Sequence, residues 1–156
     1  EIEDVMETML ALKAEGKIGG IGFSEISPAT LRRAVRVGTV DAVQSEYSLW
    51  TRQPELGLLN TCNEVGAALV PYAPLGRGIL ADKTLDPGTF GDLDFRKKNP
   101  RFTGANFTNN MERVSAFKAL AADLGITSTA LALAWCLARG DRVIPIPGTR
   151  TAEAAG

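Results

Sequence analysis

The stretch Leu69-Val70-Pro71-Tyr72-Ala73-Pro74-Leu75-Gly76-Arg77-Gly78 decides how this chain folds, because an apolar, strand-like segment runs directly into an aromatic residue and a glycine-flanked arginine. Without side chains at Gly76 and Gly78, backbone N–H groups can approach a ligand closely, and Arg77 carries a planar fork of donors suited to a phosphate. The ring of Tyr72 could lie against a flat heterocycle. This stretch alone is also compatible with a strand followed by an ordinary Pro/Gly turn.

Strand-like and helical patterns alternate on both sides of this stretch. Strands are expected at 18–23, 41–44, 67–72 and 143–147. Helices are expected at 1–16, from Ser27 with an apolar face through Val35, and at 55–65, 111–124 and 127–138. The helix over 55–65 is expected to present Leu56, Leu59 and Cys62 on one apolar side, and the prolines of 143–147 predict a short strand there. Such alternation predicts βαβ units, a parallel sheet and right-handed crossovers.

The segment 81–110 breaks this periodicity, since prolines and glycines mix there with charged residues. Long connections in compact domains are usually lids or binding loops, and the alternative is disorder. Four phenylalanines in the segment favour an ordered lid, because disordered segments are poor in aromatic residues; they are Phe90, Phe95, Phe102 and Phe107.

Composition excludes several classes of partner. The chain has 156 residues, of which 45% are hydrophobic and 22% charged, which is enough apolar content for a real core. A net charge of −1 gives no electrostatic footprint for nucleic acid or an anionic membrane. No uncharged run approaches the roughly 20 residues that cross a bilayer, and the N-terminus is acidic, so we expect a cytoplasmic protein.

The sequence predicts neither a metal site nor a cysteine redox motif. The chain has no histidine, and its two cysteines, Cys62 and Cys136, lie in predicted helices without Cys-x-x-Cys spacing. We interpret both as reduced core residues and expect no metal site.

Both ends of the chain look truncated. Apolar residues at helical spacing begin at Ile2 with no capping residue ahead of them, and Thr151 resembles the N-cap of a helix that stops after about a turn. We therefore expect 1–156 to be one part of a larger domain.

Four predicted strands end in polar or glycine-bearing clusters. These are Ser24-Glu25, Gln44, Tyr72 to Gly78, and Gly148 to Arg150. Each cluster alone has a structural explanation, such as a turn or a solvated charge. In a parallel α/β fold, however, all four lie on one face, and that face binds ligands in barrels and in doubly wound sheets.

Together these clusters resemble the C-terminal half of an aldo-keto reductase. Residues 17–25 and 43–50 are similar to the family's fifth and sixth barrel strands, and 72–78 and 144–150 to its seventh and eighth strands with the phosphate loop. The resemblance implies an α/β fold that is half of a (β/α)8 barrel, with four parallel strands alternating with helices and 81–110 as a lid within 1–156.

The resemblance also implies an NADP(H)-dependent oxidoreductase that reduces aldehydes or ketones. Ser24 and Gln44 would complement the nicotinamide carboxamide, and Tyr72 would stack on the ring. The pyrophosphate would be held by Ala73, Leu75, Gly76, Arg77 and Gly78, and the adenosine ribose with its 2′-phosphate by Gly148, Thr149 and Arg150. Glu25 stands where the family commonly has asparagine, and its contact with the cofactor is the least defined of the set.

The resemblance implies no catalytic residue in this chain. Aldo-keto reductases use a tyrosine as general acid, with lysine, aspartate and histidine, all on early strands. The two tyrosines here, Tyr47 and Tyr72, both match late-strand positions, so we expect the chain alone to be inactive. Its expected partners are a small carbonyl substrate and the N-terminal half of the barrel, without which the open sheet would self-associate.

Two other functions remain open from the sequence. A non-catalytic nicotinamide-binding sensor or accessory subunit would use the same fold. An unrelated parallel α/β domain that binds another phosphorylated ligand would show the same pattern of strand ends.

Overall fold

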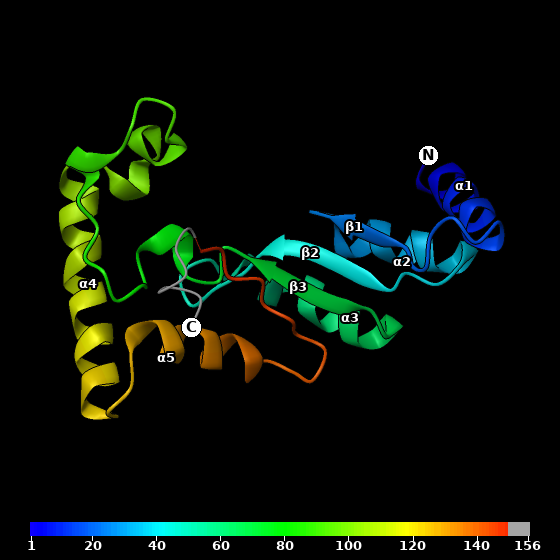
Figure 1. Cartoon of the computed structure of the whole chain (residues 1–156). Coiled ribbons are helices and arrows are strands. Elements are labelled where there is room, and N and C mark those ends of the chain that lie inside the picture. The colour runs from blue at the N-terminus through cyan, green and yellow to red at the C-terminus, as the bar shows by residue number, and fades with distance from the viewer. Residues whose placement is uncertain (150–156) are drawn as a thin grey trace.

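The computed structural model describes residues 1–149, and its helices and strands alternate along the chain (Figure 1). Their order is α1 (Ile2–Ala14), β1 (Gly22–Ser24), α2 (Pro28–Val37), β2 (Ala42–Glu46), α3 (Leu58–Val65), β3 (Ala68–Tyr72), α4 (Gly104–Asp123) and α5 (Ser128–Leu137). Short 3₁₀ turns lie at Gln53–Leu56, Gly76–Gly78, Pro87–Thr89, Phe95–Lys98 and Pro100–Phe102. The N-caps expected for α2 and α5 are confirmed, since the Ser27 and Thr127 side chains accept hydrogen bonds from the Thr30 and Ala130 N–H groups.

The sheet is parallel, in the order β1-β2-β3. The expected fourth strand is not a strand in the described part of the chain: residues 143–147 contribute only two isolated bridges, Leu69 with Val143 and Tyr72 with Ile146. The N–H groups of Ile144 and Ile146 donate to β3, whereas Pro145 and Pro147 have no N–H to donate. Because alternate residues face β3, Pro145 and Pro147 face away from it, and the donor missing from this ladder is Pro71 of β3, which has no N–H.

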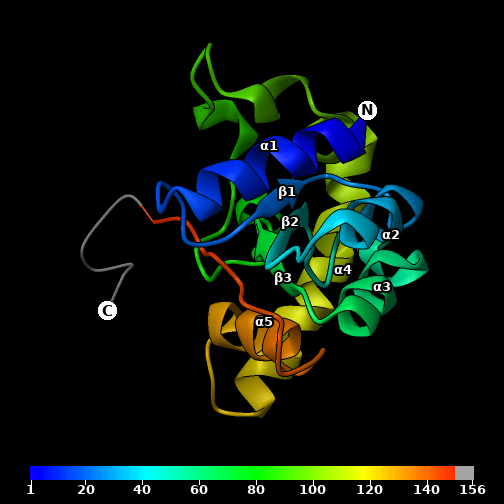
Figure 2. The same ribbon diagram turned by 90° about the vertical axis from the view of Figure 1, so that its right-hand side faces the viewer.

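One face of the sheet is buried and the other is open. Phe23, Val43 and Leu69 share a register and belong to a core with Met6 of α1 and Leu31 of α2. Helices α2 and α3 cover this face (Figure 2). Ser24 and Gln44 also share a register but lie on the opposite, exposed face. The predicted site residues Ser24 and Gln44 therefore project from the face that no helix of residues 1–149 covers.

A second, smaller core holds the segment that follows β3. It contains Ile79, Leu80, Phe90, Phe102, Val114 and Ala132. The rings of Phe90 and Phe102 meet edge to face at 5.9 Å. Residues 81–103 are thus packed by their own aromatic side chains against α4, while the role of the segment as a lid stays a prediction.

Two predicted helices have different bounds in the structure. Gly57, at φ 153, separates the 3₁₀ turn from α3, and Leu56, expected on an apolar face, is 88% exposed. Helix α4 begins at Gly104 instead of Met111, because the polar run 104–110 continues the helix N-terminally. The first strand begins at Gly22, later than the expected residue 18.

Helices α4 and α5 are bent by 90° at the break between them. Figure 1 shows them running in different directions. No single helix within residues 1–149 is long and apolar enough to cross a membrane, although this bent pair satisfies the length and composition criteria jointly.

Asp82 anchors the start of α5 from a distant loop. Its Oδ1 accepts hydrogen bonds from the N–H and Oγ of Ser128, at 2.7 and 2.8 Å, and from the N–H of Thr129 at 3.4 Å. Burial raises the pKa of Asp82, but these hydrogen bonds together lower it below its ordinary value.

Replacing Asp82 by alanine is expected to lower the free energy of unfolding by about 1 kcal/mol at pH 7, as for a lost helix cap. Because the folded-state pKa is lowered, this contribution is present above the unfolded-state pKa of about 4 and disappears as the pH falls through the folded-state value. Urea unfolding at pH 7 and pH 3 measures it, with Asp141→Ala as an exposed control. An equal loss at both pH values would contradict the assignment.

Candidate functional site

Ser24 ends β1 and lies beside Gln44, which stands two residues before the end of β2. They are register partners on the exposed face of the sheet. Neither side chain has a hydrogen-bond partner among the residues that the structure describes. A hydroxyl and an amide with free donors and acceptors are thereby presented together to whatever occupies this face.

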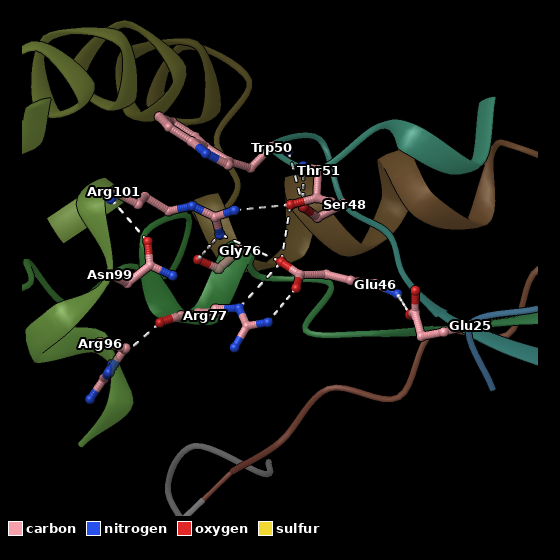
Figure 3. Close-up of polar contacts among 10 residues, drawn as sticks. All are labelled: Glu25, Glu46, Ser48, Trp50, Thr51, Gly76, Arg77, Arg96, Asn99 and Arg101. Carbon is pink, nitrogen blue, oxygen red and sulfur yellow. Dashed lines mark hydrogen bonds and ion pairs between the residues drawn. The ribbon is translucent and has the colours of Figure 1, made fainter. Parts of the chain in front are cut away.

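Tyr72 ends β3 on the same face, near the Glu25 carboxylate. That carboxylate accepts a hydrogen bond from the Ser45 Oγ at 3.1 Å. It also accepts one from the Glu46 N–H at 3.0 Å (Figure 3). Burial raises the pKa of Tyr72, as do the charges of Glu25 and Glu46. Glu25 therefore ties the end of β1 to β2, which is a bracing contact within the protein.

Three residues beyond the strand ends have left-handed backbone conformations without being glycine. They are Glu25 at φ 53, Ala73 at φ 48 and Arg77 at φ 63. Such conformations cost about 1–2 kcal/mol for an L-residue and persist where surrounding contacts impose them. All three positions follow β1 or β3, so the strain is concentrated at the edge where the predicted site residues lie.

The loop after β3 folds back on itself through its glycines. The Gly76 N–H donates to the Ala73 carbonyl at 2.9 Å, and the Gly78 N–H donates to the Leu75 carbonyl at 3.1 Å. The N–H groups of Leu75 and Arg77 have no acceptor within residues 1–149. The donors available to a ligand are therefore those of Leu75 and Arg77, between the glycines, while the glycines supply the turn.

A hollow of about 750 Å³ opens beside this loop. It is lined by Ala73, Pro74, Leu75, Arg77, Gly78, Asp94, Phe95, Arg96, Ile146 and Gly148. Ser24, Gln44, Tyr72 and Thr149 are not among the lining residues, and Gly76 is buried. Arg150 lies outside the described residues. The structure thus brings most of the predicted phosphate loop together with Gly148 and with residues 94–96 of the segment predicted as a lid.

The Arg77 side chain pairs with a carboxylate of the chain. Its Nε donates to Glu46 Oε1 at 3.3 Å and its Nη2 donates to Oε2, while the Phe95 ring lies 4.7 Å from the guanidinium carbon. Two of the five N–H donors of the guanidinium are therefore bound to Glu46 (Figure 3). The binding of a phosphate by this side chain stays a prediction.

The sequence pattern did not reveal that residues 94–96 line this hollow or that Glu46 pairs with Arg77. Arg96 pairs with Asp94 at 2.6 Å, lies over the Phe90 ring at 4.2 Å and donates to the Arg77 carbonyl at 3.3 Å. The available signal was the Asp94-Phe95-Arg96 run, which places an acidic and a basic residue on either side of an aromatic one within the aperiodic segment 81–110.

Neither tyrosine is placed as an exposed proton donor. Tyr47 is 0% exposed, and its hydroxyl donates to Glu55 Oε1 at 2.8 Å. Burial and the Glu55 carboxylate raise the pKa of Tyr47 well above its ordinary value. Among residues 1–149, no group of three or more histidine, cysteine or acidic side chains could hold a metal ion.

Comparison with known proteins adds to this geometry. The model of the aldo/keto reductase family matches residues 1–155. The chain belongs to this family. The half-barrel resemblance of the strand ends is therefore supported over nearly the whole sequence.

Two relatives place this aldo/keto reductase chain more closely. It is 44% identical over 152 residues to the aldo-keto reductase yakc [NADP(+)] of Schizosaccharomyces pombe. The matched region covers 96% of the chain and 45% of that protein. The glycerol dehydrogenase of Gluconobacter oxydans superimposes with a TM-score of 0.88 at 29% identity, covering 96% of the chain and 46% of the dehydrogenase.

A thermostable aldo-keto reductase crystallised with the inhibitor epalrestat gives a TM-score of 0.70 at 25% identity, covering 99% of the chain and 46% of that protein. The chain thus spans about half the length of the relatives it matches. Its three parallel strands and their helices correspond to half of the family's barrel.

Proposed function

We propose that this chain is the cofactor-binding, C-terminal half of an NADP(H)-dependent oxidoreductase that reduces aldehydes or ketones to alcohols. The observation that carries the proposal is the pair of unpartnered N–H groups at Leu75 and Arg77, on a loop that lines a hollow at the end of β3. Backbone donors at the C-terminal end of a parallel strand suit a phosphate group. A relative that is 44% identical bears NADP(+) in its name.

The residues present fit such a dinucleotide. Leu75 and Arg77 would hold the pyrophosphate through their backbone, and Ser24 with Gln44 would bind the nicotinamide carboxamide, whose acceptor and donors they complement. Gly148, Thr149 and Arg150 would contact the adenosine ribose and its 2′-phosphate. The bound dinucleotide supplies the hydride, and the carboxamide contacts would fix which face of its ring meets the substrate.

The proton that carbonyl reduction requires would come from outside this chain. Tyr47 is buried and its hydroxyl is bound to Glu55, and Tyr72 takes the ring-stacking role, so we assign neither tyrosine to the substrate oxygen. We propose that the N-terminal half of the barrel supplies the acid and covers the open sheet face, and that without it the chain self-associates through that face. We also propose that the protein is located in the cytoplasm.

The second candidate function is a non-catalytic nicotinamide-binding sensor or accessory subunit on the same fold. The observation that favours it is the burial of Tyr47, whose hydroxyl is bound to the Glu55 carboxylate. Cofactor binding with no turnover in the complete gene product would favour the sensor, and turnover of an aldehyde would favour the reductase.

Replacing Gln44 by alanine is expected to weaken NADPH binding about tenfold, because two hydrogen bonds to the carboxamide are lost. Titration of the purified protein with NADPH, followed by cofactor fluorescence, measures the dissociation constant. Gln53→Ala removes an amide from the 3₁₀ turn after β2 and serves as the matched control. Equal affinities for both variants and the unaltered protein would contradict the carboxamide assignment.

A further inference from the structure

Glu46 is the point where the loop after β3 and the segment 94–101 converge. It is the last residue of β2, and its side chain is only 14% exposed. Arg77 binds both of its carboxylate oxygens, the Thr51 hydroxyl donates to Oε1 at 3.0 Å, and Arg101 lies 3.6 Å from Oε1 (Figure 3). Burial raises the pKa of Glu46, but these hydrogen bonds and charges together lower it, so the group is a carboxylate at neutral pH.

Both arginines that meet Glu46 also act on the backbone of the loop. Arg77 is itself the left-handed residue at φ 63, and Arg101 donates to the Gly76 carbonyl at 3.4 Å. Arg101 also donates to the Thr51 hydroxyl at 3.1 Å. The Glu46 carboxylate therefore fixes the Arg77 side chain. It also fixes Arg101, the cation that binds the carbonyl of Gly76.

Glu46 is also needed to keep two partly buried cations together. The side chains of Arg77 and Arg101 are 25% and 17% exposed, and burial together with the charge of Arg77 lowers the pKa of Arg101. Like charges this close repel one another unless an anion lies between them. Without the Glu46 carboxylate, the arginines would separate, and the strained conformation of Arg77 would lose its main restraint.

We propose that Glu46 is a positioning residue for the anion site: through Arg77 and Arg101 it holds residues 75–77 in the conformation that exposes the Leu75 and Arg77 N–H groups. The proposal rests on the proposed function, in that the ligand is a phosphate-bearing molecule. It assigns to β2 a part in binding that neither the flanking glycines nor the phosphate loop itself reveals.

The Glu46→Gln variant separates positioning from simple electrostatics by the sign of its effect. Removing a negative charge near an anion site strengthens anion binding if charge alone matters. If Glu46 positions the loop, the variant instead weakens binding, because glutamine keeps the size of the side chain but not the ion pairs. We expect a five- to tenfold rise in the dissociation constant of inorganic pyrophosphate and of NADP⁺, measured by titration calorimetry.

Two further variants complete the comparison. Glu64 of α3 forms an exposed ion pair with Arg32 of α2. Glu64→Gln removes an equal charge there and is expected to change neither the pyrophosphate nor the NADP⁺ dissociation constant by more than twofold. Thr51→Val removes the hydroxyl that bridges Glu46 and Arg101 without changing any charge, and is expected to weaken binding in the same direction but less. Equal or tighter binding by Glu46→Gln would overturn the proposal.

Hydrogen exchange without ligand tests the positioning separately from the proposed function. Faster exchange of the Gly76, Gly78 and Leu80 amides is expected in Glu46→Gln, because their turn hydrogen bonds depend on the held loop. If the unaltered protein binds neither anion, the proposed function fails. Exchange then decides the role of Glu46 alone, and unchanged rates in 76–80 would refute it.

Discussion

Replacing Tyr47 by alanine is expected to lower the free energy of unfolding by about 3–5 kcal/mol, as for other large buried aromatic residues. The Tyr47 ring is fully buried in the main core and lies 5.3 Å from the Trp135 ring of α5. Its hydroxyl binds Glu55. The substitution therefore removes a core ring, the contact between sheet and α5, and a buried hydrogen bond together.

Urea unfolding followed by circular dichroism measures this loss, and two variants bracket it. Tyr47→Phe keeps the ring and is expected to cost about 1 kcal/mol, the net contribution of the hydrogen bond to Glu55. Leu56→Ala alters a side chain that is 88% exposed and is expected to change stability by less than about 0.5 kcal/mol. A loss for Tyr47→Ala no larger than that for Tyr47→Phe would show that the ring is not part of a close-packed core.

Replacing Gly76 by valine is expected to abolish measurable binding of inorganic pyrophosphate and to destabilise the protein by about 2–5 kcal/mol, combining a left-handed backbone with overpacking. Gly76 is buried at φ 60, and a Cβ there would lie 3.0 Å from Ile79 Cγ2 and 3.3 Å from the Trp50 Cβ. The turn must move to accept the new side chain, and the Leu75 and Arg77 N–H groups would move with it.

Gly91→Val is the matched control for this substitution. A Cβ at Gly91 meets nothing within 4 Å, and Gly91 is not among the glycines with positive φ. Titration calorimetry with pyrophosphate and a thermal melt are measured on both variants. Retention of pyrophosphate binding by a folded Gly76→Val protein would place the anion site elsewhere.

The order of strands and helices was predictable from the sequence because it depends on local patterns. The caps at Ser27 and Thr127 and the apolar run 67–72 depend on neighbouring residues alone, and all three lie where expected. The bounds were less predictable where one backbone angle decides them. Gly57 at φ 153 ends the 3₁₀ turn and exposes Leu56, and no periodicity reveals that angle.

The side-chain pairings of the candidate site were not predictable from the sequence. Flanking glycines and a preceding strand predict a ligand loop at 73–78, and they gave no sign that the Arg77 side chain is paired with a carboxylate. Its partner Glu46 lies 31 residues earlier, and the Arg96 that binds its carbonyl lies 19 residues later. Side-chain pairings over such separations are set by the fold, so a linear pattern could not distinguish a bound arginine from a free one.

The left-handed conformations of Glu25, Ala73 and Arg77 have a consequence for how the molecule loses its structure on heating. Strain beyond the strand ends lowers the free energy needed to open these loops locally, whereas the sheet beneath them is held by a separate core. The loops after β1 and β3 are therefore expected to unfold as their own cooperative unit. Ligand binding would be lost at a lower temperature than the helical signal, so that a heated sample could retain its secondary structure after its function has gone.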